Sequence, residues 1–174
     1  MKMGREPGRD SPKDPPPNVV DEALFRRLVQ LEINKARRLQ YSVSLVCVTP
    51  TEGEEGVDQT FARRVTEAVS RQFRTTDVLT ARAPASIWLL LVNADTRDLP
   101  EIFRRTATEL EAQISATGVT RPITWGAGAS CYPRTATTEV ELVGQAAEAM
   151  QRARLQGVNT LVLPPRAGRD SPIS

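Results

Sequence analysis

Residues 73–92 read FRTTDVLTARAPASIWLLLV, and this stretch decides how the chain folds. It contains two apolar, β-prone runs, Val78 to Ala81 and Ile87 to Val92, on either side of a short break at Ala83-Pro84-Ala85. Strand-like runs that flank such a break predict a β-hairpin. We expect function at the break and in the polar residues that precede the first run.

Helical and strand-like segments alternate on both sides of this hairpin. Apolar residues recur at helical spacing in four segments, at about residues 20–40, 58–73, 100–117 and 138–155. Three further segments are β-prone: 43–48, which we expect Pro50 to end, 122–131 and 160–163. Helices interleaved with strands in this order predict an α/β sandwich, in which helices flank a central, mostly antiparallel five-stranded sheet.

The length and composition favour one domain between two tails. A chain of 174 residues is long enough to bury a substantial core without a disulfide or a metal. Proline and charged residues dominate the first 18 positions, and the end of the chain from Pro164 is similar. We therefore predict a disordered tail over 1–18, a folded domain over 19–163 and a second disordered tail over 164–174.

Several classes of function are disfavoured by composition. The net charge is only +2 and no basic block is present, which argues against nucleic acid as a partner. No apolar run approaches the length of a membrane span, and the charged N-terminus lacks the core of a signal peptide, so we expect a cytoplasmic protein without a membrane partner. Histidine is absent, which excludes His-based triads and metal sites. Cys47 and Cys131 each lie in an apolar strand-like run, where a buried free thiol is expected, and we predict no cofactor.

Three separated segments share the order and spacing of one family's motifs. Arg74-Thr75-Thr76-Asp77 lies five residues before Ala83-Pro84-Ala85-Ser86-Ile87, residues 123–130 read ITWGAGAS, and residues 146–159 read AAEAMQRARLQGVN. Over about residues 20–163 the chain thereby resembles the GGDEF domain of diguanylate cyclases, bacterial enzymes that make cyclic di-GMP from two GTP. The resemblance implies the nucleotide-cyclase-like fold and a role in signalling.

The departures from the family pattern concern the metal. The family signature is Gly-Gly-Asp/Glu-Glu-Phe, whereas Pro84 here removes an amide donor and Ala85 and Ser86 supply no carboxylate. The family's other metal acid ends the first strand, where this chain has Thr49-Pro50-Thr51. Phosphoryl transfer depends on metal and cationic stabilisation, so we expect a degenerate domain that is not an enzyme and holds no metal.

The guanine side of the family's active site also differs. The link from Pro50 to Val57 is too short for the family's guanine-binding residues. In the last helix Arg154 keeps the charge of a phosphate-binding Lys, while Val158 replaces an Arg.

One ligand site of the family keeps its key residues in this sequence. In the family, Arg-x-x-Asp is the core of an allosteric site for the product, and Arg74 and Asp77 match it by position. The resemblance places a second arginine at Arg105, with Arg104 beside it. It therefore implies binding of cyclic di-GMP by Arg74, Asp77 and Arg105, because arginine forks suit phosphate and guanine acceptors and a carboxylate accepts from guanine N–H groups.

Two other interpretations remain open from the sequence. In the first interpretation, Arg74 and Asp77 simply cap the second helix and form a surface ion pair of little energetic value. In the second, the chain is a protein-interaction or dimerisation module that presents the helix at 20–40 to a partner or to another copy. Trp88 and Trp125 lie in strands, where packing is a commoner role than stacking on a base.

Overall fold

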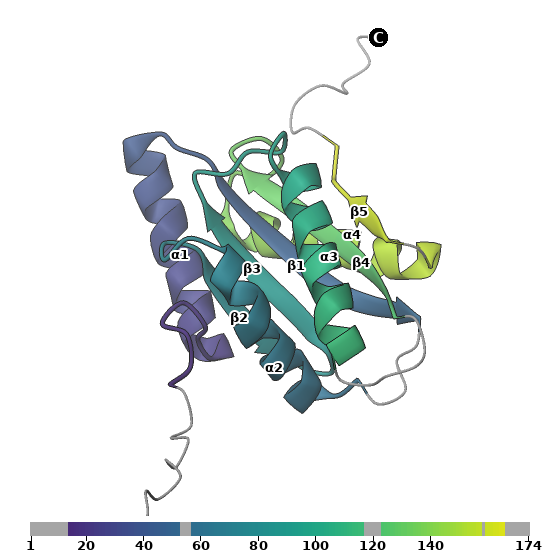
Figure 1. Cartoon of the computed structure of the whole chain (residues 1–174). Helices are drawn as coiled ribbons and strands as arrows, with labels where there is room; N and C mark the ends of the chain where they lie inside the picture. The colour runs from purple at the N-terminus through teal and green to yellow at the C-terminus, as the bar shows by residue number, and fades with distance from the viewer. Residues whose placement is uncertain (1–13, 53–56, 117–122, 158, 166–174) are drawn as a thin grey trace, which may run out of the picture.

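The computed structural model describes residues 14–52, 57–116, 123–157 and 159–165. Four helices, five strands and a short 3-10 turn follow one another within these residues (Figure 1). In chain order they are α1 (Glu22–Leu39), β1 (Val43–Glu52), α2 (Gln59–Val69), the 3-10 turn (Ser70–Gln72), β2 (Val78–Arg82), β3 (Ser86–Val92), α3 (Leu99–Ala116), β4 (Thr124–Tyr132), α4 (Glu139–Gln156) and β5 (Thr160–Val162). The predicted order of elements is confirmed, and the expected helix end at Thr117-Gly118 lies outside the described residues.

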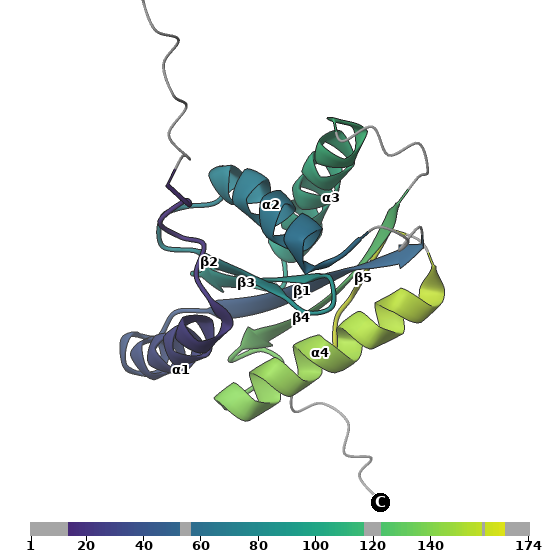
Figure 2. The ribbon, with the colours of Figure 1, turned by 90° about the horizontal axis from the view of Figure 1, so that it is seen from below.

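The strands form one sheet in the order β2-β3-β1-β4-β5. The pairs β2/β3, β3/β1 and β1/β4 are antiparallel, and only β4/β5 is parallel. The predicted central, mostly antiparallel five-stranded sheet with a β-hairpin is thus confirmed. Helices α2 and α3 cover one face of the sheet, and α1 and α4 cover the other (Figure 2).

Each face of the sheet carries its own buried core, because side chains alternate along a strand. Leu89 and Trp125 belong to the core under α2 and α3, whereas Trp88 and Leu90 belong to the core under α1 and α4. Trp125 is 1% exposed and Trp88 is 4% exposed, so both indoles are packing residues, as the sequence favoured.

Close contact between β4 and α4 depends on a glycine of the ITWGAGAS segment. A Cβ at Gly128 would lie 1.9 Å from the backbone nitrogen of Met150 and 2.5 Å from the carbonyl oxygen of Ala146. Only a residue without a side chain lets the strand approach the helix this closely. This motif position therefore serves packing.

The predicted end of the first strand is wrong. Strand β1 continues past Pro50 to Glu52, because its pairing with β3 ends at Val48 and Pro50 faces only Trp125 on β4. A proline is tolerated where no neighbouring strand needs its missing N–H. Residues next to the predicted start of the domain lie along the edge of β2. Asn18, the last residue of the predicted tail, is 8% exposed, and its backbone carbonyl accepts a hydrogen bond from the Leu79 N–H at 2.8 Å, so residues 18–20 cover this edge.

Candidate functional site

The residues before the hairpin form a tight turn that Asp77 locks in place. The Asp77 N–H donates to the Arg74 carbonyl at 3.0 Å, and the Asp77 carboxylate accepts from the Arg74 N–H at 3.2 Å. The other carboxylate oxygen accepts from the Val92 N–H at 3.0 Å, which ties the turn to the end of β3. Asp77 is only 7% exposed. Its first role is therefore to fix the backbone that carries Arg74.

This geometry corrects one of the two open interpretations. No ion pair between Arg74 and Asp77 occurs in the described structure, where Asp77 bonds backbone N–H groups instead. Helix α2 ends earlier, at a C-cap on Ser70, so neither residue caps it.

Arg74, Asp77 and Arg105 line one cleft, although the sequence separates them widely. The cleft has a volume of about 430 Å³ and lies between the Arg74–Asp77 turn, the end of β3 and the first turns of α3. Arg74 and Arg105 are exposed, whereas Asp77 is buried beneath them. The remaining lining combines apolar and charged side chains: Gln72, Phe73, Leu91, Val92, Asn93, Ala94, Arg97, Asp98, Glu101 and Ile102.

The acids of the cleft are already engaged within the protein. Asp98 accepts from the Asp95 N–H at 2.8 Å, and Glu101 pairs with Arg104 at 2.6 Å. The hydrogen bond from Arg104 holds the pKa of Glu101 below its usual value. Arg104, the neighbour that the sequence set beside Arg105, is thereby occupied.

The arginines of the cleft make fewer contacts with the rest of the protein than its acids do. The side chains of Arg74 and Arg105 make no hydrogen bond or ion pair of 4 Å or less with any described residue. Arg97 lies 3.7 Å from Asp95 and its side chain is 82% exposed. Three carboxylates and three guanidinium groups line the cleft, so its formal charges balance, and the uncommitted groups that it exposes to an anion are Arg74 and Arg105.

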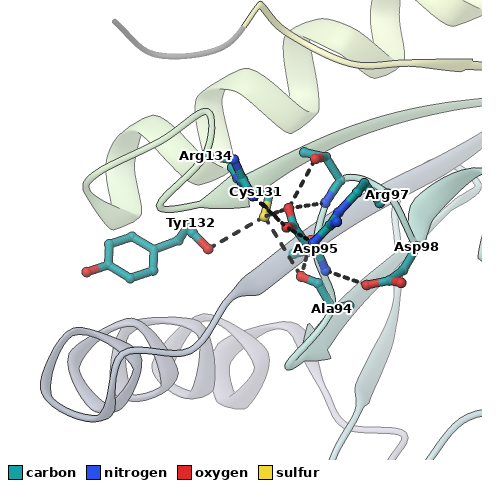
Figure 3. Close-up of polar contacts among 9 residues, drawn as sticks. Ala94, Asp95, Arg97, Asp98, Cys131, Tyr132 and Arg134 are labelled. Atoms are coloured by element: carbon teal, nitrogen blue, oxygen red, sulfur yellow. Dashed lines mark hydrogen bonds and ion pairs between the residues drawn. The ribbon is translucent and has the colours of Figure 1, made fainter.

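Asp95 anchors the loop that forms one wall of the cleft (Figure 3). Its carboxylate accepts from the Thr96 N–H at 2.6 Å and from Arg134, in the β4–α4 loop, at 3.3 Å. Burial works to raise the pKa of Asp95, but the Thr96 hydrogen bonds and the Arg134 charge outweigh it and hold the pKa below its usual value. The buried Cys131 thiol lies 3.8 Å from the same carboxylate, and burial raises its pKa. The sequence does not signal this link, because the Asp95-x-x-Asp98 spacing indicates only a local turn.

The tip of the hairpin has a different character. Arg82 pairs with Ser86, so Ala83, Pro84 and Ala85 form a three-residue loop. The Ser86 hydroxyl accepts from the Trp88 indole N–H at 3.2 Å and donates to the Arg82 carbonyl at 3.3 Å. Ile87 is fully buried in the core and Ala85 is 7% exposed. The hydroxyl of this tip is therefore bonded within the protein.

The neighbouring end of β1 carries no acid from Thr49 to Thr51, and the strand ends at Glu52. Thr49 is 9% exposed, and the Thr51 hydroxyl is hydrogen-bonded to the Thr124 hydroxyl at 2.5 Å. Within the described residues, no cluster of three or more Asp, Glu, Cys or His side chains is placed to hold a metal ion. Arg154 lies in the last turn of α4, whereas Val158 and residues 53–56 of the Pro50–Val57 link fall outside the described residues.

The comparisons with known proteins agree with this fold. The family model described as "Diguanylate cyclase, GGDEF domain" matches residues 18–160. A match over most of the chain shows that this protein belongs to the GGDEF family, whose signalling molecule is cyclic di-GMP. No curated protein sequence matches the chain significantly.

Solved structures of bacterial GGDEF domains share the architecture at low identity. The GGDEF domain of YfiN (also TpbB) from Pseudomonas aeruginosa is 18% identical, with a TM-score of 0.74 over 84% of this chain and 97% of that chain. DgcB from Caulobacter crescentus, solved in complex with c-di-GMP, is 12% identical, with a TM-score of 0.64 over 93% of this chain and 98% of that one. The diguanylate cyclase SiaD from Pseudomonas aeruginosa, solved with its activator SiaC, is 18% identical, with a TM-score of 0.64 over 83% of this chain and 58% of that one. Among the residues that our structure describes, no helix combines the length and the apolar character needed to cross a membrane.

Proposed function

We propose that this protein is a catalytically inactive GGDEF domain that binds cyclic di-GMP in the cleft of Arg74, Asp77 and Arg105. The observation that carries the proposal is that these three residues, from a turn and a separate helix, line the same cleft. Family membership supplies the ligand class, and the c-di-GMP complex of DgcB shows that a domain of this fold binds it.

The chemistry of the cleft supports an anionic, guanine-containing ligand. Arginine presents a planar fork of donors that matches phosphate oxygens or the acceptor edge of guanine. Arg74 and Arg105 are exposed and unpaired in the described structure, so a ligand need not break an internal ion pair to reach them. A carboxylate has about four acceptor positions. Asp77 uses one on each of two backbone N–H groups and keeps others for guanine N–H donors.

The lack of catalysis rests on the hairpin tip and the end of β1. Ala85, Ser86 and Thr49 stand where the resemblance expects metal-binding acids, and none can hold a divalent cation on a triphosphate. Phosphoryl transfer depends on such a cation to neutralise the charge that develops in the transition state. Binding of the product at the base of the hairpin needs no metal.

Neighbouring arginines on α3 provide a matched test. We expect Arg105→Ala to weaken cyclic di-GMP binding by roughly 10- to 150-fold, the equivalent of about 1.5–3 kcal/mol for a hydrogen bond to a charged group. Arg104→Ala removes the same charge from the next position, where Glu101 holds it, and should change the affinity only a few-fold. Isothermal titration calorimetry of both variants measures the difference. Equal effects of the two substitutions would reduce the role of Arg105 to general charge.

A second candidate function rests on the outer face of α1. Leu24, Leu31 and Leu39 on this helix are 43%, 53% and 68% exposed. Such side chains favour a protein-interaction or dimerisation module, formed with another copy or with a different protein, as SiaD is activated by SiaC. Light scattering of the wild type and of Leu31→Glu tests it, because a dimer through this face should dissociate in the variant.

A further inference from the structure

A second cavity lies on the face of the sheet that α1 and α4 cover. Its volume is about 380 Å³, within the range of roughly 300–1,000 Å³ that is typical of small-molecule sites. The start of α1, the β2–β3 hairpin and the start of α4 border it, and it opens to solvent. Its walls are mainly apolar and include Phe25, Val29, Trp88, Val140 and Val143. The cyclic di-GMP cleft shares none of these residues.

The floor of this cavity presents a flat, charged surface. The Arg82 guanidinium lies 4.5 Å from the centre of the Trp88 ring, and Glu22 holds it there through an ion pair of 3.0 Å. The Arg82 side chain is 31% exposed. Guanidinium groups stack on planar rings. An aromatic ligand in the cavity can therefore extend the stack that Trp88 and Arg82 begin.

A buried hydroxyl in the floor has no hydrogen-bond partner. Thr80 pairs across the hairpin with Trp88, lines the cavity and is 1% exposed. Among the described residues, none bonds its Oγ1 atom. Buried polar groups are nearly always bonded in folded proteins, because leaving one unpaired is costly. This hydroxyl points to a ligand that carries a hydrogen-bonding group.

The α4 wall of the cavity is open at Gly144. A Cβ at this position would meet no atom within 4 Å, in contrast to Gly128, where it would strike α4 itself. Gly144 is exposed in the interior of a helix, where glycine is otherwise unfavourable. Packing therefore does not require a glycine at position 144. The missing side chain leaves space beside the cavity.

The charges around the cavity restrict the kind of ligand. Two carboxylates, Glu22 and Glu139, face two guanidinium groups, Arg26 and Arg82. Both arginines pair with Glu22, at 2.7 and 3.0 Å. The balance of charge attracts neither a polyanion such as a nucleotide nor a polycation, and the apolar walls make a buried ligand charge expensive.

We infer that this cavity is a second binding site, specific for an uncharged aromatic molecule with a group that hydrogen-bonds Thr80. Each property of this molecule follows from one feature of the cavity. The stack on Trp88 and Arg82 selects an aromatic ring, the unpaired Thr80 hydroxyl selects a hydrogen-bonding group, and the apolar walls select an uncharged molecule. The inference is independent of cyclic di-GMP, because the two sites lie on opposite sides of the hairpin and share no residue.

A pair of fluorescent probes tests the site directly. N-phenyl-1-naphthylamine is uncharged, aromatic and carries one N–H, whereas 1-anilinonaphthalene-8-sulfonate adds only a sulfonate to the same rings. We expect saturable, one-site fluorescence enhancement by the full-length protein with the uncharged probe. The sulfonate should bind at least about tenfold more weakly, because the apolar walls must desolvate its charge. No saturable signal from the folded protein, or equal binding of both probes, would overturn the inference.

Three variants locate the probe. Gly144→Phe should fill the cavity and abolish binding, while Gly144→Ala leaves it open and should bind as the wild type does. Thr80→Val keeps the shape but removes the hydroxyl, and it should weaken the uncharged probe by about three- to tenfold, as expected for one lost hydrogen bond. Circular dichroism confirms that each variant is folded. Unchanged binding to Gly144→Phe would place the probe elsewhere, and unchanged binding to Thr80→Val would remove the specified hydrogen bond.

Discussion

The two ends of the β2–β3 hairpin use their polar groups in opposite ways. At the tip, the Ser86 hydroxyl is bonded to Trp88, and Arg82 is paired with Glu22. At the base, Arg74 and Arg105 remain exposed and unpaired in the described structure, above a buried Asp77. The polar side chains of the tip are bonded within the protein, whereas the two arginines at the base remain accessible to a ligand.

Under the proposed function, this contrast separates a role that the tip has lost from a role that the base has kept. The resemblance implies a tip with glycines and acids for metal and substrate, and in this chain Ala83-Pro84-Ala85 closes the same hairpin without them. The base serves the fold and the proposed ligand with the same side chain, because Asp77 bonds two backbone N–H groups. Substitutions at the base, at the wall of the cleft and at the tip can each break this contrast.

Removing the buried carboxylate at the base should have the largest effect. Asp77→Ala deletes two charge-assisted hydrogen bonds, one of them across to β3, and should lower the free energy of unfolding by about 3–5 kcal/mol. Asp58→Ala removes a single exposed helix cap and should cost only about 1 kcal/mol. Urea denaturation of both variants provides the measurement. A small, equal loss in both would show that Asp77 does not hold the hairpin base.

The Asp95 anchor should make the wall of the cleft sensitive to acid. Because its pKa is lowered on folding, Asp95 stabilises the folded state above the unfolded pKa of about 3.9 and loses this contribution as the pH falls through the folded value. Asp95→Asn should thus be less stable than the wild type at pH 7, by about 1–3 kcal/mol. The difference should shrink below about pH 4. Thermal unfolding across this pH range, with Asp21→Asn as an exposed control, will show whether the gap closes; a gap independent of pH would contradict the assignment.

Rebuilding the tip should have no catalytic effect. Pro84→Gly combined with Ala85→Asp restores part of the family signature, but the end of β1 still lacks an acid at Thr49 or Thr51. We expect no cyclic di-GMP from GTP and Mg²⁺, because one carboxylate does not provide the metal site that phosphoryl transfer needs. Chromatography of the reaction mixture would detect the product, and its appearance would show that the tip alone blocks catalysis.

The sequence predicted the elements of the fold well because its periodicities are strong. Alternating helices and strands around the 73–92 hairpin identified the sheet and its layers, and the placement of Arg105 in the same cleft as Arg74 followed from the family resemblance. Contacts that depend on strand register could not be predicted from the sequence. The bond from the Val92 N–H to Asp77 and the link from Arg134 to Asp95 join residues far apart in the chain.

Local contacts explain why β1 continues past Pro50 and why Asn18 lies against the sheet. Proline usually ends a strand, but Pro50 lies where β1 has no β3 partner, and this depends on how far the hairpin extends. Asn18 looks like part of a polar tail, yet its backbone pairs with the edge of β2 and its side chain reaches the Ser70 carbonyl. Composition alone does not reveal such an edge contact.

Calorimetric titration of cyclic di-GMP into the wild type and into Arg74→Ala measures the proposed binding and its dependence on the hairpin base. The Arg74 side chain makes no hydrogen bond or ion pair to a described residue, so its removal should leave the fold unchanged. We predict saturable binding by the wild type and its loss, by at least about tenfold, in the variant. No heat from a folded wild type, or equal affinity in Arg74→Ala, would contradict the proposal that the base of the hairpin is a cyclic di-GMP site.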